Sequence, residues 1–424
     1  MVGSLKLYNT LTRKKDVFVP VKKGYVGIYS CGPTVYSYQH IGNLRTSVYN
    51  DLLKRLFLYN GYRVKHITNV TDVGHLTSDA DIGEDKVERA ASREGKTAKE
   101  ISNYYFNLFK EDLKKLNVIE PDKWPKATEH INEMISLIKI LEKKGFTYKT
   151  SDGIYFDTSK LKDYGKLAGL KKEGLKAGKR VAVGEKKHKT DFALWKFSER
   201  PGVRQQEWNS PWGIGFPGWH IECSVMSSKY LGNQIDVHTG GQEHIPVHHT
   251  NEIAQSEAGY GKKPWVKYWV HFAWLLFDGE KISKSRGGAY TLSELEEEGY
   301  NPMALRYLYL TTHYKKPLNF SFDMLDYAQN AYKRLKNILS EIKKARDKKN
   351  KKNINLAKKQ FLEIINDDLN SSKALAYLWD ILRSDNLNDA EKYELAINFD
   401  KFFGLELDNE EKVDVSASIK KMVQ

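Results

Sequence analysis

The pattern of apolar and polar positions near the N-terminus predicts a strand, a helix and a second strand. Residues 25–30 (YVGIYS) are rich in β-branched and aromatic side chains, which is typical of a short buried strand. Apolar residues then recur at helical spacing up to Asn60-Gly61, a signal for the end of a helix. A second strand-like run covers residues 62–70. Because parallel strands need a crossover between them, this order predicts a βαβ unit in a parallel α/β sheet.

Helical periodicity governs much of the remaining chain. Residues 97–116 and 131–146 have the spacing of amphipathic helices, whereas the basic, glycine-spotted stretch 160–189 predicts loops. Asn301-Pro302 is a helix-start signal. One apolar face then runs from Leu325 to Ile342, and further helices are expected near 356–370, 372–383 and 389–403. The chain therefore predicts an α/β domain with an insertion, followed by a helical bundle.

The composition narrows the class of protein. A chain of 424 residues is longer than one core usually organises, so roughly two to four domains are expected. No apolar run approaches the roughly 20 residues of a membrane helix, and no secretory signal opens the chain. Two cysteines cannot form a disulfide framework, which favours the cytoplasm. The formal charge of +14 favours a polyanion such as RNA, although solvated lysine-rich surfaces would produce the same excess.

Two short motifs carry the nucleotide chemistry. The Gly95-Lys96-Thr97 stretch fails as a P-loop, because Ala90 stands where that motif needs glycine. HIGN (40–43) instead opens the predicted first helix, where free N–H groups and the helix dipole favour a phosphate. Together with KISKS (281–285), it is similar to the paired ATP signatures of class I aminoacyl-tRNA synthetases.

These motifs suggest roles in adenylate formation. His40 and the helix N-terminus would contact the triphosphate, while Lys281 and Lys284 would neutralise the leaving pyrophosphate. The resemblance makes Lys284 the catalytic lysine. We also expect ATP contacts at Gly42, Asn43, Gly240 and Gly241. The alternatives are a histidine that only caps its turn and a basic surface loop.

The two cysteines suggest a metal site. Cys31 and Cys223 can combine with His248 and Glu252, which share one face if they lie on a helix. Two sulfurs, one nitrogen and one oxygen suit zinc. Two buried cysteines and an ordinary helix-surface pair would be the alternative interpretation.

Six stretches, in order, resemble cysteinyl-tRNA synthetases over about residues 5–405. They are CGPTVY, HIGN, GWHIECS, the HH–NE pair, KISKS and DDLNSSKALAYLW. The resemblance implies that Cys31, Cys223, His248 and Glu252 bind one zinc ion, which takes the thiolate of the substrate as a further ligand. It also implies a substrate pocket of Thr71, Trp219, His238 and Glu243, the last replacing a commoner aspartate. Zinc prefers thiolate to hydroxyl, so serine can be rejected without editing.

The resemblance implies a class I synthetase fold, with a Rossmann-like parallel-sheet catalytic domain, an insertion and an α-helical bundle. The expected divisions are 1–115 and 205–265 for the catalytic domain, 116–204 for the insertion, 266–315 for the KISKS connection, 316–403 for the bundle and 404–424 for a short C-terminal remnant. Six basic residues of the bundle are expected to contact tRNA phosphates. They are Lys333, Arg334, Lys336, Lys343, Lys344 and Arg346.

The implied function is that of a cytoplasmic, monomeric cysteine--tRNA ligase. It would join L-cysteine to ATP, with magnesium, and then transfer cysteine to cysteine tRNA. The remnant after residue 404 predicts weaker anticodon discrimination than a longer relative shows. A mycothiol-pathway cysteine ligase and an inactive RNA-binding paralogue are the alternatives.

Overall fold

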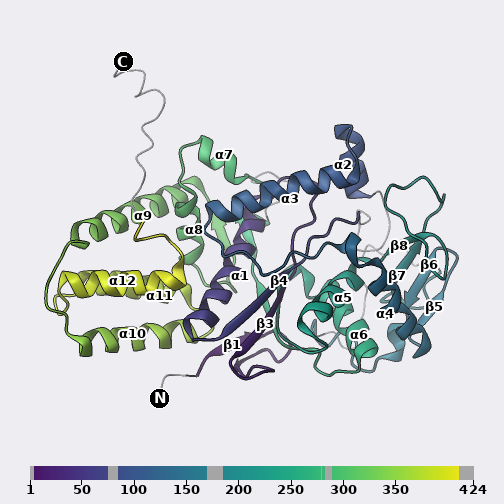
Figure 1. Cartoon of the computed structure of the whole chain (residues 1–424), viewed down its shortest axis with the longest axis horizontal. Helices are drawn as coiled ribbons and strands as arrows, with labels where there is room; N and C mark the ends of the chain where they lie inside the picture. Colours follow the sequence, from purple (N-terminus) through teal and green to yellow (C-terminus); the bar gives the residue numbers. More distant parts are fainter. Residues whose placement is uncertain (1–3, 75–84, 170–184, 278, 282–288, 410–424) are drawn as a thin grey trace.

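A parallel sheet forms the centre of the molecule (Figure 1). A computed structural model of the chain describes residues 4–74, 85–169, 185–277, 279–281 and 289–409. The sheet has the order β10-β9-β3-β4, and all its pairings are parallel. Its strands are β3 (Tyr25–Ser30), β4 (Arg63–Thr68), β9 (Ile235–Gly241) and β10 (Val266–Phe272). The predicted βαβ unit and parallel α/β sheet are confirmed.

Alternating side chains of the sheet enter two hydrophobic cores. Val26 and Ile28 of β3 join the core that contains the buried side of helix α1 (Ile41–Tyr59), which links β3 to β4. Tyr29 joins the other core, with α4 (Ile131–Lys143), α5 (Trp219–Leu231) and α6 (His248–Tyr260). Since successive strand residues point to opposite faces, the sheet has helices on both sides. None of the described helices combines the length and apolar character needed to cross a bilayer.

The insertion contains an antiparallel sheet that the sequence analysis missed. Its four strands are β5 (Thr147–Lys149), β6 (Gly153–Phe156), β7 (Phe192–Phe197) and β8 (Gly215–Pro217), in that order. Helices and loops alone were expected between residues 116 and 204, where β5, β6 and β7 lie, whereas β8 lies in the following stretch, where strand-like and loop segments were expected. Strands of three to six residues give little periodicity, and β6 pairs with β7 across a long connection. The predicted loop residues 170–184 lie outside the described ranges. Helices α2 (Lys86–Glu94) and α3 (Ala98–Lys115) precede α4 and this sheet in sequence.

Two small sheets flank the central one. The hairpin of β1 (Lys6–Asn9) and β2 (Lys14–Val17) lies near β10. The other sheet has the order β12-β11-β13, formed by β12 (Glu280–Lys281), β11 (Leu275–Phe277) and β13 (Leu318–Phe320). Helices α7 (Leu292–Glu297) and α8 (Pro302–Leu310) lie between β12 and β13 in sequence, and Asn301 caps α8 as predicted.

The C-terminal part is a helical bundle, as predicted. Its helices are α9 (Phe322–Ile342), α10 (Lys351–Asn366), α11 (Ser371–Arg383) and α12 (Asp389–Phe403). The predicted apolar face of α9 is buried at Leu325, Ala328, Tyr332, Leu335 and Leu339. Figure 1 shows the bundle and the insertion sheet at opposite ends of the molecule, with the parallel sheet between them.

Candidate active site

A cavity of about 540 Å³ lies where the parallel strands end. Its lining includes the residues after β3 and β4, the end of β9 and the first turns of α1, α5 and α6, together with residues of α3 and of the segment that follows α3. In the order β10-β9-β3-β4, the chain leaves β3 toward β4 on one side, and leaves β9 toward β10 on the other. The cavity therefore occupies the topological switch point at which open α/β sheets bind ligands.

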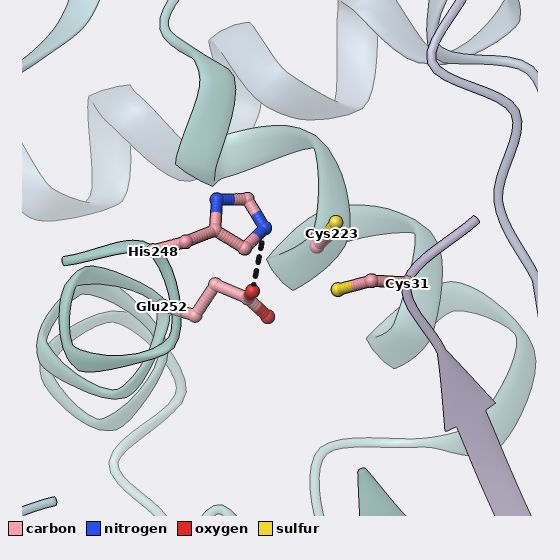
Figure 2. Close-up of side chains that lie close together, drawn as sticks. All are labelled: Cys31, Cys223, His248 and Glu252. Carbon is pink, nitrogen blue, oxygen red and sulfur yellow. Dashed lines mark ion pairs between the residues drawn. The ribbon is translucent and has the colours of Figure 1, made fainter. Parts of the chain in front are cut away.

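The four predicted metal ligands meet at this cavity (Figure 2). Cys31 follows β3, Cys223 lies in the second turn of α5, and His248 and Glu252 lie one turn apart on α6. Their ligand atoms are all within 4.8 Å of one another. Cys31 is half-buried and the other three are buried. Residues that are far apart in sequence thus form one candidate metal site.

Neighbouring histidines orient two of these side chains. His220 Nδ1 lies 2.9 Å from His248 Nδ1, so the other ring nitrogen of His248 faces the cluster, 2.9 Å from Glu252 Oε1. His238 Nε2 lies 2.8 Å from Glu252 Oε2. One carboxylate oxygen is thereby held from behind while the other faces the cluster. Such outer partners fix the orientation of metal ligands.

The cluster gathers negative charge in a buried place. The hydrogen bond with Cys31 outweighs burial and lowers the pKa of Cys223 to about 7. Burial disfavours the charge of Glu252, but His238 and His248 outweigh it and lower the pKa of that carboxyl to about 2. Burial likewise opposes the charge of His248, but Glu252 and Cys223 raise its pKa to about 10. A thiolate and a carboxylate that converge in this way suit a divalent cation.

Two histidines that the sequence analysis missed lie behind Cys31. His249 Nε2 is 3.3 Å from Cys31 Sγ, and its Nδ1 is 2.7 Å from Nε2 of His271. His249 also belongs to a second compact group of four donors, with Cys31, His238 and Glu252. This group shares two members with the predicted set. His271 is an isolated histidine and carries no sequence signal, whereas His249 could have been noticed in the HH–NE pair and His220 inside GWHIECS.

The predicted substrate residues surround the cluster unevenly. Trp219 packs against His248 with ring centroids 4.3 Å apart, and both Trp219 and Thr71 line the cavity. Glu243 also lines it, and its Oε2 accepts a hydrogen bond from Trp274 Nε1 at 2.8 Å. His238 is fully buried behind Glu252 and is not among the lining residues. Its link to the site is its contact with Glu252, which belongs to the candidate metal site and does not line the cavity either.

The HIGN turn forms the other side of the cavity. His40 is the N-cap of α1: its Nδ1 accepts from the Asn43 backbone N–H, and Asn43 Oδ1 accepts from the His40 N–H, both at 3.3 Å. A side chain at Gly42 would meet the His40 ring at 3.0 Å, so glycine keeps this turn tight. His40 is thus a helix cap and also a cavity residue together with Asn43.

The remaining predicted nucleotide residues are placed as follows. Gly241, at the end of β9, lines the cavity, whereas Gly240 lies against the His249 ring and is not part of the lining. A Cβ at Gly241 would approach the Glu243 carboxylate to 2.3 Å. Lys281 ends strand β12, and Lys284 lies outside the described residues.

Comparisons with known proteins identify the family. A family model described as "tRNA synthetases class I (C) catalytic domain" matches residues 17–330. Cysteine--tRNA ligase 1 of Burkholderia lata is 49% identical over 404 residues, covering 95% of this chain and 84% of that relative. The cysteine--tRNA ligase of Treponema denticola is 42% identical over 426 residues, covering 95% and 86%. The chain belongs to the cysteine--tRNA ligase family.

Solved structures agree on the fold of this family member. The methionyl-tRNA synthetase of Mycobacterium tuberculosis, in complex with methionyl-adenylate, superposes with a TM-score of 0.60 at 12% identity, covering 89% of this chain and 88% of the other. A putative arginyl-tRNA synthetase from Campylobacter jejuni gives 0.55 at 16% identity, covering 93% and 94%. At such identities the likeness shows the fold alone, and the expected class I synthetase fold is confirmed.

Proposed function

We propose that this chain is a cysteine--tRNA ligase that activates L-cysteine with ATP and then transfers cysteine to the 3′ end of cysteine tRNA. The observation that supports this most strongly is that one cavity joins the thiol-rich metal cluster to the nucleotide turn. Amino acid and ATP must meet in such a cavity for an adenylate to form. The family relatives carry the same activity in their names.

The donor set of Cys31, Cys223, His248 and Glu252 fits zinc. Two sulfurs exclude the oxygen-preferring cations calcium and magnesium as the natural occupants. When bound, zinc supplies a soft Lewis acid that favours the thiolate of cysteine over the hydroxyl of serine. The other residues of the pocket would hold the cysteine substrate beside the metal-binding residues. Trp219 covers His248, and Glu243 offers a carboxylate for the substrate ammonium group.

Adenylate formation then depends on the other side of the cavity. The substrate carboxylate attacks the α-phosphate of ATP, and pyrophosphate leaves. His40 and the N-terminus of α1 contact the phosphates, while Lys281 and Lys284 neutralise charge that develops on the leaving group. Magnesium accompanies ATP as part of the substrate. The residues of the cavity thus divide into a side that selects the amino acid and a side that activates it.

The bundle provides basic residues for tRNA phosphates. Of the six predicted contacts, Lys336 and Lys343 already contact the segment 406–409, because Lys336 Nζ donates to Glu406 O at 2.9 Å and Lys343 pairs with Asp408 at 3.4 Å. The phosphate contacts that we retain in the proposal are those of Lys333, Arg334, Lys344 and Arg346. Contacts of this kind position RNA without reading its bases.

The experiment is cysteine-dependent ATP–pyrophosphate exchange, followed by aminoacylation of cysteine tRNA, with zinc measured on the same sample. We expect exchange with cysteine, none with serine, about one zinc per chain and charging of the tRNA. Exchange without charging of tRNA, but with transfer to an amino-sugar, would identify a mycothiol-pathway ligase. Absence of exchange in a zinc-loaded chain would identify an inactive paralogue.

A further inference from the structure

Arg45 connects the first helix to a distant part of the chain. It lies in α1, two residues after the HIGN turn, and is 1% exposed. Its Nη1 donates to the carbonyl oxygens of Ala273 and Trp274, the latter at 2.8 Å, and its Nη2 donates to Lys316 O at 2.8 Å. One guanidinium therefore holds three carbonyls that are more than 200 residues away in sequence.

Those carbonyls belong to the frame that carries Lys281. Ala273 and Trp274 join β10 to β11, and Lys316 precedes β13, which pairs with β11. On its other side β11 pairs with β12, so that Leu276 lies opposite Lys281. Because Arg45 fixes the entry of both β11 and β13, it fixes the small sheet to which the backbone of Lys281 belongs.

The first turn of α1 also holds the chain beyond the KISKS segment. The Ile41 N–H donates to Tyr290 O at 2.8 Å, and His40 forms a bridge with Thr291. Tyr309 of α8 donates to Ile41 O at 2.6 Å. The described residues on both sides of KISKS are thus tied to the turn that contains His40.

Trp274 connects Arg45 to the amino-acid side of the cavity. The Trp274 carbonyl accepts from Arg45, while the Trp274 indole N–H donates to Glu243. Glu243 lines the cavity with His40 and Asn43. Arg45 therefore lies at a junction of three parts of the site, although it does not line the cavity itself.

The buried charge of Arg45 faces carbonyl oxygens rather than a carboxylate. Within the described ranges, no carboxylate lies within ion-pair distance of Arg45, and its charge meets only carbonyl dipoles and the Tyr49 ring, 5.2 Å away. Arg306 is equally buried but pairs with Asp51. A buried charge without a counter-ion is costly, so the rigid fork of three carbonyl contacts is the gain that offsets it.

We propose that Arg45 is a positioning residue for adenylate formation. It sets the distance between the HIGN turn, which holds the phosphates of ATP, and the lysine-bearing sheet, which neutralises the pyrophosphate. This inference rests on the proposed function. It assigns no contact between Arg45 and substrate. Its effect appears in the chemical step, because displacement of a charged group by about 1 Å can lower a rate about 100-fold.

The test compares Arg45→Lys with the matched control Arg306→Lys. Each removes a buried guanidinium that donates to three backbone carbonyls, since Arg306 donates to Phe403, Leu116 and Asn117. Lysine cannot hold three acceptors in one plane. Cysteine-dependent ATP–pyrophosphate exchange gives kcat and both KM values, while bound zinc and urea unfolding report on the amino-acid side and on stability.

We expect both variants to be less stable and to keep their zinc. Arg45→Lys should lower kcat about 10- to 100-fold with little change in the KM for cysteine, whereas Arg306→Lys should keep kcat within about twofold. Equal kcat values in the two variants, or a loss confined to the KM for cysteine, would overturn the inference. Wild-type protein without exchange would instead refute the proposed function.

A milder variant covers the case in which Arg45→Lys does not fold. Tyr309→Phe removes one hydroxyl, the donor to Ile41 O in the same turn. The loss of one hydrogen bond that acts in the transition state corresponds to a fall in kcat of about 2- to 10-fold. An unchanged kcat in Tyr309→Phe would then count against the positioning role of this frame.

Discussion

Two buried clusters of ionisable side chains show opposite designs. The first, which we call the bundle cluster because it contacts the end of bundle helix α12, consists of Asp51 and Arg55 on α1 and Arg306 on α8. Asp51 Oδ1 accepts from the Ile119 N–H at 2.9 Å, and its Oδ2 accepts from Arg55 Nε at 2.7 Å and from Arg306. The remaining arginine donors reach backbone carbonyls, including those of residues 401 and 403 at the end of α12. Its charges thus meet partners inside the protein, and they join the catalytic domain to the bundle.

The candidate metal site of Cys31, Cys223, His248 and Glu252, here called the metal cluster, is not closed in this way. Two sulfurs and a carboxylate oxygen converge within 4.8 Å, and three of these four residues face the 540 Å³ cavity. Donors that converge on a point beside a cavity suit a ligand, whereas charges that neutralise one another within the core serve to fasten elements together. Burial and charge alone do not distinguish the two cases; the direction of the donor atoms does.

The largest expected effect comes from the metal cluster. Cys223→Ser replaces a soft ligand by a hydroxyl that zinc binds poorly. We expect loss of most of the bound zinc and of cysteine-dependent exchange, with the unfolding midpoint of the zinc-free protein little changed. Metal analysis and the exchange assay measure this. Asp51→Asn is the control, since it should keep its zinc. Full zinc occupancy in Cys223→Ser would remove that residue from the ligand set.

A change on the activating side should leave both clusters intact. Lys284→Ala removes the ammonium group that, in our proposal, neutralises negative charge on the leaving pyrophosphate. The kcat of exchange should therefore fall about 100- to 1,000-fold. Zinc content, unfolding and the affinity for cysteine should remain as in the wild type. Stopped-flow measurement of adenylate formation separates rate from binding. Normal turnover with weak cysteine binding would contradict the division between a selecting and an activating side.

A substitution in the bundle cluster should lower the unfolding free energy rather than the activity. Asp51→Asn leaves two buried guanidinium groups without their carboxylate, which typically costs about 3–5 kcal/mol of unfolding free energy. Urea unfolding measures this loss, and kcat per folded molecule should be nearly unchanged. If Asp51→Asn instead lowered kcat strongly without changing stability, the two clusters would not differ as described.

The same residue predicts a pH dependence. Burial opposes the charge of Asp51, but Arg306 and Arg55 outweigh it and lower the pKa of this carboxyl below its ordinary value. A carboxyl whose pKa is lower in the folded protein contributes stability above its unfolded pKa of about 3.9. That contribution is lost as the pH falls through the lower, folded pKa. The wild-type protein should therefore have a larger unfolding free energy than Asp51→Asn at neutral pH, and this difference should disappear only in strong acid.

Much of this arrangement could be predicted from sequence. Local patterns located β3, α1 and the apolar face of α9, because one strand or helix determines its own periodicity. The four candidate ligands could be named because the motifs around them resemble one family. Their convergence within 4.8 Å is a property of the fold. The limits of the expected domains remain predictions.

The parts that sequence could not predict are tertiary. The insertion sheet depends on pairing between residues 153–156 and 192–197, which no local pattern announces. Arg45 looks like any basic residue of a helix until its three carbonyl partners are known. His238 was expected in the substrate pocket from a motif, but its contact is with Glu252. A motif identifies a residue, whereas the neighbours of that residue define what it does.

The smallest expected effect concerns His238, which contacts Glu252 instead of lining the predicted substrate pocket. His238 holds Glu252 Oε2 from behind and stacks on Trp269 with ring centroids 4.6 Å apart. His238→Phe keeps an aromatic ring there but removes the donor, so zinc affinity should fall about 10- to 100-fold. His238→Gln retains an N–H that can reach the carboxylate and should restore most of the affinity. Competition with a chelator measures both variants. If His238→Phe bound zinc as the wild type does, and instead lost affinity for cysteine, His238 would belong to the substrate pocket, as the motif alone had suggested.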